Sequence, residues 1–282
     1  MKDSSRRGSR KFDKGTLLGL LFAVCGIVGG LLAEKGTLAD VSQGTAALIV
    51  FGGTLGAILI GTPLNEVWSA LQALKLVFFD PREPVHELLE DLINFATRAR
   101  RNGIVSLDSD AEQIDDPFLK KALIMAIDGL EATELRTMME MDLHVEERRM
   151  LQRAKVFERA GGYAPTIGII GAVLGLIQVM KSLANIDEVG RGIAVSFVAT
   201  LYGVGSANLL FLPAANKIRN HVRHRVEVME LVVEGVAGIV EGMNPRMLRR
   251  KLETLAGEQT EKMLSAPDAL NAQPAAEERV SL

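Results

Sequence analysis

Small and hydroxyl-bearing residues recur at helical spacing in two apolar runs of the sequence. Near one helix face of the first run, 161–180, lie Gly168, Gly171 and Gly175, with Ala172 beside them. The matching row of the second run, 192–215, consists of Ser196, Thr200, Gly203 and Ala207. Small residues let the backbones of two membrane helices approach closely. Ordinary helix packing accounts for both rows, and a sharper hypothesis is that part of each row lines a narrow path against another helix.

The apolar runs contain no acidic or basic side chain that would carry a proton or bind a cation. Within residues 15–62, outside the loop 33–43, the only ionisable residue is Cys25. The runs 164–180 and 192–215 contain no Asp, Glu, His, Lys or Arg. Proton relays and cation pumps in membranes normally use buried carboxylates or histidines. If this protein helps to move ions, a partner should therefore supply the carboxylate; the alternative is a passive membrane scaffold.

Two prolines lie in these helical runs. Pro165 falls in the first turn of the run 164–180, where proline is easily tolerated. Pro213 lies deep within a helical run from 192 to about 241 and should kink it or free a carbonyl group. Neighbouring helices or water must then satisfy that carbonyl. The sequence leaves open whether the bend at Pro213 is a hinge or is static.

No other motif indicates chemistry on a substrate. The sequence has no Walker phosphate-binding loop, no GxGxxG motif after a strand and no GxSxG motif. His221 and His224 lie among arginines, a poor setting for a cation and a typical one for a helix at a membrane surface. We therefore predict that the protein is not an enzyme and has no metal or other cofactor. The net charge of -3 is too small to indicate nucleic acid as a partner.

Four apolar runs are the elements that must position the small residues and prolines. Of the 282 residues, 48% are hydrophobic and 24% charged, and the two kinds separate along the chain, which indicates membrane spans plus a polar domain. A helix needs about 20 apolar residues to cross a bilayer. The predicted spans are Gly15–Leu32, Thr45–Thr62, Ala164–Met180 and Gly192–Ala215. The first run is long for the apolar part of a signal peptide and lacks a clear cleavage site, so we expect it to be retained.

Between the second and third spans the chain is charged and has helical periodicity. Apolar residues from Val85 to Ala96 recur at helical spacing, and Gly103 is a plausible stop. A second helix begins at Pro117 with Asp115 or Asp116 as its cap, and a third, longer one covers 131–160. The predicted fold is an all-α membrane protein, with four transmembrane helices and a helical cytoplasmic domain between the second and third.

The distribution of positive charge predicts the orientation. Six Lys and Arg residues precede the first span, whereas the outer loops contain few. The positive-inside rule then puts both termini and the middle domain in the cytoplasm. The predicted segments are a basic cytoplasmic N-terminus (1–14), a transmembrane hairpin (15–62), a cytoplasmic helical domain (63–162), the third and fourth transmembrane helices (163–215), a basic cytoplasmic helical region (216–257) and a disordered tail (258–282).

Several separated motifs resemble the MotA/PomA family of flagellar stator proteins. "YAPTIGIIGAVLGLIQVM" (163–180) and "ANIDEVGRGIAVSFVATLYGVGSANLLFLPAANKI" (184–218) are similar to the paired inner helices of that family. "ARRNGIVSLDSDAEQIDDPFLKKAL" (99–123) resembles the segment of the family that meets the rotor. The resemblance extends over nearly the whole chain apart from its two ends, and the motifs occur in the family's order.

The resemblance implies a stator subunit of the inner membrane. Members form a ring, expected to be a pentamer, around two copies of a MotB-like single-span partner that carries the essential aspartate, and they act on a FliG-like rotor protein. Pro165 and Pro213 match the family's prolines for conformational coupling. Arg100 and Asp108 match its rotor-facing residues, although many relatives have Glu at the second position. Asp108 keeps the charge on a shorter side chain.

The predicted lining of the ion path consists of Ala172, Gly175, Thr200 and Gly203. Sodium-driven relatives tend to have a threonine at the position of Ala172, while the fourth-span threonine is present as Thr200. Sodium needs several oxygen ligands and a proton needs only a carboxylate and water. One missing hydroxyl therefore favours protons. Two alternatives remain open: an ExbB/TolQ-type energiser of an outer-membrane system, which typically has three spans, and a structural membrane scaffold.

Overall fold

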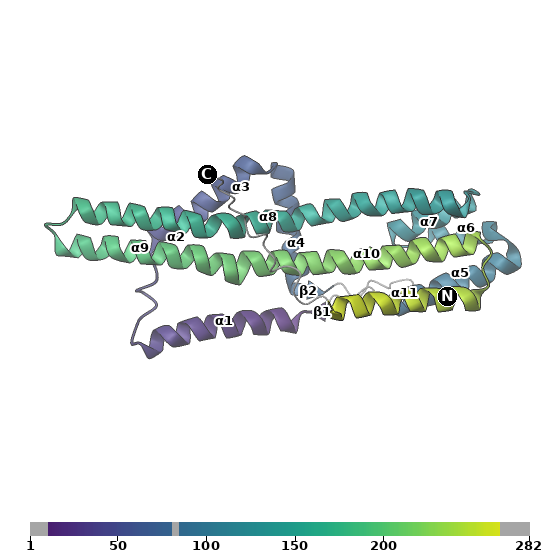
Figure 1. The fold of residues 1–282 in the computed structure, drawn as a ribbon, viewed down its shortest axis with the longest axis horizontal. Coiled ribbons are helices and arrows are strands. Elements are labelled where there is room, and N and C mark those ends of the chain that lie inside the picture. Colours follow the sequence, from purple (N-terminus) through teal and green to yellow (C-terminus); the bar gives the residue numbers. More distant parts are fainter. Residues whose placement is uncertain (1–10, 81–84, 266–282) are drawn as a thin grey trace, which may run out of the picture. The chain divides into compact units, whose positions relative to one another are not determined.

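The computed structural model describes residues 11–80 and 85–265, which are helical apart from short loops and one small strand pair (Figure 1). The strands β1 (Lys11–Phe12) and β2 (Phe79–Asp80) pair antiparallel. Two residues in each strand are too few for the alternation by which strands are recognised in a sequence. The predicted helical class is confirmed apart from this pair.

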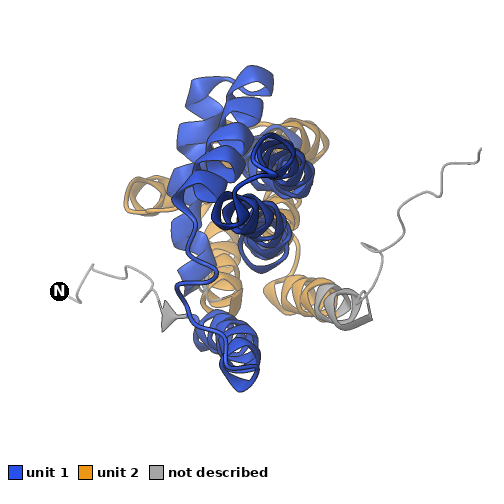
Figure 2. Cartoon of the chain, turned by 90° about the vertical axis from the view of Figure 1, so that its left-hand side faces the viewer, with its two compact units in different colours: residues 1–83, 144–224 blue, residues 84–143, 225–282 orange. Residues whose placement is uncertain are grey.

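The chain forms two compact units, each built from segments far apart in the sequence. Unit 1 comprises residues 1–83 and 144–224, and unit 2 comprises residues 84–143 and 225–282 (Figure 2). The long helices α8 (Ala132–Lys181) and α10 (Leu212–Val240) contribute residues to both units.

Within residues 11–80 and 85–265, four helical segments are long and apolar enough to cross a membrane, as predicted. The first is α1 (Lys14–Ala33), capped by Asp13, whose Oδ1 accepts a hydrogen bond from the Gly15 amide at 2.9 Å. The second consists of α2 (Gly44–Ala47), the π-helical η1 (Leu48–Gly52) and α3 (Gly53–Gly61). The third lies in α8 and the fourth in the continuous helical run Ile186–Val240. This is therefore a multi-pass membrane protein.

The helix α8 corrects the expected position of Pro165. The third helix of the middle domain and the third span are one helix of 50 residues, so Pro165 lies in a helix interior and not in a first turn. Proline has no N–H, so the carbonyl of Gly161 lacks its helical donor. The helix continues through Gly161, Gly162 and Pro165, although glycine and proline often mark turns in a sequence. The change in composition near residue 160 marks a change of surroundings and not the end of the helix.

A π-helical turn lies directly before Pro213, where the sequence predicts a kink or a freed carbonyl group. The fourth span runs through α9 (Ile186–Ser206), the π-helical η3 (Ala207–Phe211) and α10. Pro213 cannot donate to the carbonyl four residues before it, and the wider hydrogen-bond spacing of a π turn directly precedes it. Such turns are frequent at functional sites.

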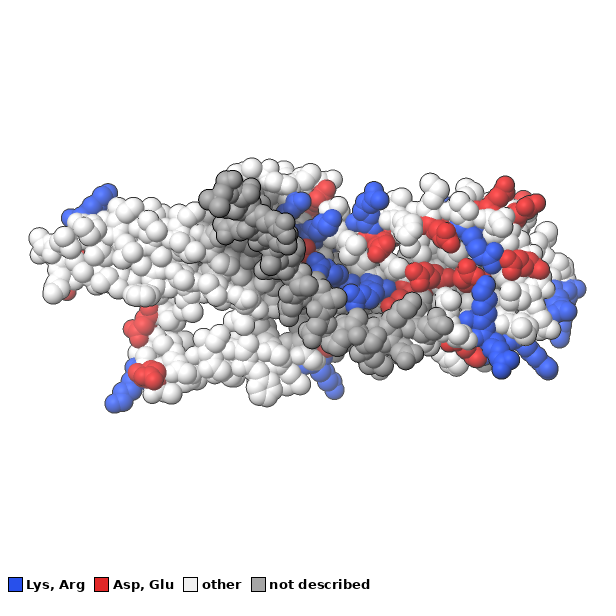
Figure 3. Space-filling model, in the orientation of Figure 1, with Lys and Arg blue, Asp and Glu red and all other residues white. Residues whose placement is uncertain are grey.

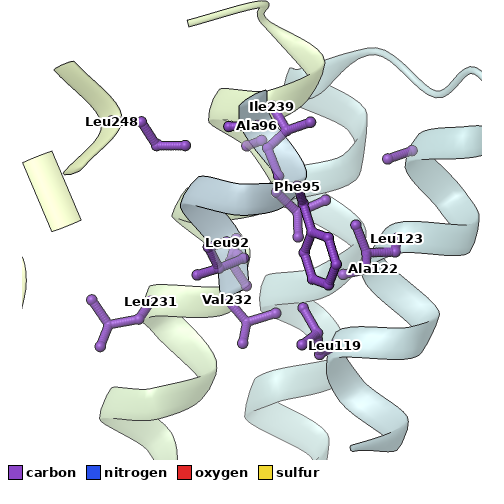
Figure 4. Packing of buried hydrophobic residues seen from close by; sticks show 14 of the residues in the cluster. Leu92, Phe95, Ala96, Leu119, Ala122, Leu123, Leu231, Val232, Ile239 and Leu248 are labelled. Atoms are coloured by element: carbon purple, nitrogen blue, oxygen red, sulfur yellow. The ribbon is translucent and has the colours of Figure 1, made fainter. Parts of the chain in front are cut away.

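Unit 2 is a helical bundle around one apolar core. Its complete elements are α5 (Val85–Asn102), the 3-10 helix η2 (Ile104–Leu107), α6 (Asp108–Glu112), α7 (Pro117–Ile127) and α11 (Pro245–Ser265). Asp116, and not Asp115, caps α7 by accepting from the amides of Phe118 and Leu119. The labelled core residues in Figure 4 are Leu92, Phe95, Ala96, Leu119, Ala122, Leu123, Leu231, Val232, Ile239 and Leu248.

The helix α4 (Leu64–Phe78) follows the second span after Thr62 and Pro63. α11 continues to Ser265, so residues 258–265, which the sequence assigns to a disordered tail, are helical. No Pro or Gly interrupts that stretch before Pro267. The rest of the predicted tail and most of the basic N-terminus lie outside the described residues.

Candidate functional site

Glycines bring α8 and α9 into backbone contact at the predicted lining residues. A Cβ atom added to Gly203 would lie 2.5 Å from the Ala164 carbonyl oxygen, and one added to Gly168 would lie 2.9 Å from that of Ala199. A Cβ on Gly175 would also collide with α9. Side-chain carbons are not found at such distances, so only glycine fits without a shift of the helices. Helix packing therefore explains Gly175 and Gly203, which are buried between α8 and α9.

Hydroxyl groups in this interface are held by backbone carbonyls. Ser196 Oγ lies 2.9 Å from the carbonyl oxygens of both Ala172 and Gly192, either of which can accept its proton. Thr200 Oγ1 donates to the Ser196 carbonyl oxygen at 3.2 Å. Ser196 thus connects Ala172 and Thr200, which are both half-buried. The structure brings these two predicted residues close together, whereas the sequence indicates Ser196 only as a small residue.

Gly161 connects the helix turns at the two prolines. A Cβ on Gly161 would lie 2.6 Å from Leu212 Cδ2, so this glycine packs directly against the residue before Pro213. Gly161 is also the residue whose carbonyl lacks a donor at Pro165. The structure therefore brings the weakened turns of α8 and α10 side by side within unit 1.

Arg159 ties α8 to the end of the second span. Its Nη1 donates to the Gly61 carbonyl oxygen at 3.1 Å and to Thr62 Oγ1 at 2.7 Å. A cation at the C-terminus of a helix also interacts favourably with the helix dipole. The contact lies one to two turns before Pro165 along α8.

Two ion pairs join the part of α10 after Pro213 to other helices of unit 1. Lys217 of α10 pairs with Asp13, the cap of α1, and Arg219 pairs with Glu158 of α8. Hydrogen bonds from Lys217 and Thr16 hold the pKa of the Asp13 carboxyl well below its usual range. Pro213 therefore lies just before a segment of α10 that is anchored by charge to both α1 and α8.

Two polar side chains within the spans have surroundings that the sequence does not reveal. The Tyr202 hydroxyl donates to the Val41 carbonyl oxygen at 2.6 Å and accepts from the Gln43 amide at 3.2 Å, which holds the loop between the first and second spans against α9. Thr54 is only 2% exposed, and its hydroxyl has no hydrogen-bond partner in the part of the chain that the structure describes. A polar residue in an apolar run indicates that it has a special role or partner. The sequence does not show, however, that the partner of Tyr202 is a residue about 160 positions away.

The predicted rotor-facing residues are exposed and unpaired. Arg100 lies in the last turn of α5 and Asp108 begins α6, and the turn between them passes through Gly103, whose φ of 82° is left-handed. Neither charged group has an ion pair or hydrogen bond with any residue in the described ranges. Their neighbours Arg98 and Asp110, in contrast, pair at 2.6 Å. The arrangement leaves one cation and one anion available to a partner.

Charged side chains gather over one part of the molecule, and the apolar stretches of α8 and α9 form a surface with almost none (Figure 3). One pair in unit 2 joins the cap of α7 to α10, with Arg225 Nη1 2.7 Å from Asp116 Oδ2. Burial opposes ionisation of Asp116, but Arg225 and the amides of Leu119 and Phe118 outweigh it and lower its pKa. Within the described residues, no group of three or more His, Cys, Asp or Glu is placed to hold a metal ion.

Comparison with known proteins gives matches along most of the chain. Residues 17–103 match the family model described as "Motility protein A N-terminal". Residues 110–231 match that of the MotA/TolQ/ExbB proton channel family. Motility protein A of Bacillus subtilis (strain 168) is 34% identical over 241 residues, which cover 85% of this chain and 89% of the relative.

Two solved structures share the fold. The structure of C. jejuni MotAB has a TM-score of 0.81 at 33% identity and covers 86% of this chain and 95% of the matched chain. The flagellar MotAB stator complex from Bacillus subtilis has a TM-score of 0.80 at 32% identity, with coverage of 90% and 100%. Sequence and fold agree over nearly the same length, and the chain belongs to the motility protein A family within the MotA/TolQ/ExbB proton channel proteins.

Proposed function

We propose that the chain is the MotA-type subunit of a bacterial flagellar stator, which converts ion-motive force into torque on the rotor. The observation that carries this proposal is the fold likeness to two MotAB structures over at least 86% of this chain. The match of residues 17–103 to a motility protein model favours a stator over an ExbB/TolQ-type energiser. We expect the protein in the inner membrane with both termini in the cytoplasm.

The proton carrier in this proposal belongs to a MotB-like partner with a single span. The apolar parts of the four spans hold no carboxylate, and a buried carboxylate is the usual relay group in membranes. Several copies of this chain, expected to be five, surround two partner helices and present Ala172, Gly175, Thr200 and Gly203 near the partner's aspartate. Because Ala172 lacks a hydroxyl, the path suits protons better than sodium.

Coupling between the ion and the rotor runs through the two prolines. When the partner's aspartate gains or loses a proton, the local charge changes, and the adjacent helices shift. The turns at Pro165 and Pro213 lack regular hydrogen bonds and touch through Gly161, so they are the parts of α8 and α10 that bend most easily. We propose that this bend reaches the cytoplasmic domain and moves Arg100 and Asp108.

Rotor contact in this proposal is electrostatic. Arg100 and Asp108 are exposed charges of opposite sign, and complementary charges on a FliG-like rotor protein would set register and association rate more than affinity. An isolated exposed pair contributes only about 0–1 kcal/mol. Such weak contacts suit a surface that must bind and release repeatedly.

Deletion and purification test the proposal together. We expect that deleting the gene abolishes swimming, that the gene restores it, and that the tagged chain co-purifies with a one-span protein bearing a membrane aspartate. A partner-free monomer, combined with normal swimming after deletion, would contradict a stator role and favour a membrane scaffold. Loss of an outer-membrane uptake function with intact swimming would instead favour the energiser.

A further inference from the structure

A pocket of about 420 Å³ lies within unit 1 between the second span and the α8–α9 pair. Thr45 and Ile49 line it from α2 and η1, and Leu174 lines it from α8. The remaining wall comes from α9, including Glu188, Arg191 and Val195. All of these residues belong to unit 1, in which α2 and η1 lead obliquely past α8 and α9 (Figure 1).

The pocket combines an apolar wall with two opposite charges. Ile49, Leu174 and Val195 provide aliphatic surface, while Glu188 and Arg191 come from the first two turns of α9. Although they lie three residues apart on one helix, the carboxylate and the guanidinium do not pair with each other. Neither group makes an ion pair or hydrogen bond with any residue in the described ranges. Both charges are therefore open to a ligand.

We propose that this pocket binds a phospholipid with a primary-ammonium headgroup, of the phosphatidylethanolamine class. The Arg191 guanidinium would hold the phosphate, for which its paired N–H donors are well suited. The Glu188 carboxylate would accept hydrogen bonds from the ammonium group. One acyl chain of the bound lipid would run along Ile49, Leu174 and Val195.

The chemistry of the pocket disfavours other occupants. A metal cation would be repelled by Arg191, and a free anion would be repelled by Glu188 and leave the aliphatic wall uncovered. The segments that form the pocket belong to candidate membrane spans, and α9 begins at the short loop between the third and fourth of them. The two charges thus lie at the end of the spans, where headgroups meet the hydrocarbon core.

The site bears on the predicted ion path because Gly175 also lines the pocket. A lipid bound there would hold the second span against the α8–α9 contact at one of the predicted lining residues. The inference needs only the membrane location of the chain, not its role as a stator. Failure of one can therefore be recognised without failure of the other.

Lipid retention by the purified complex tests the site. The full chain, purified with any protein that co-purifies with it, is exchanged into nanodiscs or detergent containing equal amounts of phosphatidylethanolamine and phosphatidylglycerol. Native mass spectrometry and lipid extraction then count retained phospholipid. For the wild type we expect one tightly held phospholipid per chain with phosphatidylethanolamine preferred.

The variants separate the two charges. Arg191→Gln should lower retention of both lipids about tenfold, as expected for the loss of a charge-assisted hydrogen bond. Glu188→Gln should abolish the preference for phosphatidylethanolamine and keep total retention. Thr45→Phe, which fills the pocket, should also reduce retention. The controls Lys181→Gln and Asp187→Asn change exposed charges near the same loop and should behave as the wild type.

Three results would overturn the proposal. The first is equal phospholipid retention by the wild type and Arg191→Gln. The second is no preference of the wild type for phosphatidylethanolamine. The third is that the control variants lose as much bound phospholipid as Arg191→Gln. Swimming of each variant is recorded separately. A strain that swims normally with lipid-free protein would leave the stator proposal intact while removing any role for the lipid in it.

Discussion

At the residue scale, the glycines between α8 and α9 are the positions with the least room for a side chain. A Cβ on Gly203 would lie 2.5 Å from a backbone oxygen of α8, whereas Gly205 on the same helix has no atom within 4 Å of that position. Gly203→Ala should therefore force the helices apart and destabilise the protein by about 1–3 kcal/mol. Gly205→Ala should be neutral or stabilising by up to about 1 kcal/mol. Thermal unfolding of the purified complex compares the two variants. Equal melting temperatures for Gly203→Ala and Gly205→Ala would contradict the close contact of Gly203 with α8.

Substitution of Arg100 tests the proposed rotor contact. Because its guanidinium has no partner among the described residues, Arg100→Glu should leave folding and co-purification unchanged and reduce swimming. A complementary charge change on the rotor protein should restore part of the swimming speed. Arg246→Glu, at an exposed arginine in the first turn of α11, is the control. Full speed in Arg100→Glu would count against rotor contact at this residue.

At the element scale, the π turn before Pro213 is the place where the proposed function expects α10 to bend. Pro213→Ala restores an N–H, so η3 can become regular helix, and stability should rise by as much as about 3 kcal/mol. Torque should fall nonetheless, since the easily bent turn is lost, and Pro165→Ala should act in the same direction. Tethered-cell rotation and melting measure the two effects. Pro117→Ala, in the first turn of α7, offers no comparable gain. Normal swimming in both the Pro165 and Pro213 variants would remove their coupling role.

The cap of α7 predicts how stability changes with pH. Asp116 has a native pKa below its unfolded value of about 3.9, so its ion pair contributes stability above that pH. The contribution is lost as pH falls through the lower native pKa. Asp116→Asn should cost about 1–2 kcal/mol at pH 7 and lose less stability on acidification than the wild type. Asp115→Asn, at the exposed neighbour, is the control. Parallel melting curves for wild type and Asp116→Asn from pH 7 to acid would contradict this account.

The helices themselves were predictable because each has a clear local signal. The apolar face of α5, the Asp-Pro start of α7 and the composition of the four spans all lie within a few turns of sequence. The continuity of α8 was not predictable, since a helix that passes from polar to apolar surroundings changes composition without ending. Long-range contacts were also hidden: nothing local indicates that Tyr202 reaches Val41 or that Gly161 packs on Leu212.

Only part of the candidate site was predictable from the sequence, because local signals do not reveal long-range contacts. Small size at helical spacing indicated that Gly168, Gly175 and Gly203 face another helix, and the structure identifies that helix as part of the same chain. The hydrogen bonds of Ser196 depend on how α8 and α9 are aligned along their axes, which periodicity does not determine. The roles of Pro165, Pro213, Arg100 and Asp108 rest on the family resemblance and stay predictions.

At the scale of the whole molecule, this chain has closely packed helices, prolines within two of them and exposed charges, but no carboxylate within the apolar parts of its spans. An ion-driven motor built from it therefore depends on a second protein for the step that gains and loses the proton. The proposed function rests on that dependence. It distinguishes a stator subunit from a channel that conducts by itself and from a scaffold that conducts nothing.

The most direct test is swimming of a strain that lacks both genes and is supplied with this chain and its one-span partner. We expect that the wild-type pair restores swimming in sodium-free medium and that a protonophore stops it. Replacing the partner's membrane aspartate by asparagine should abolish swimming while the two proteins still co-purify. Swimming that persists with the asparagine partner would contradict the claim that the partner carries the proton.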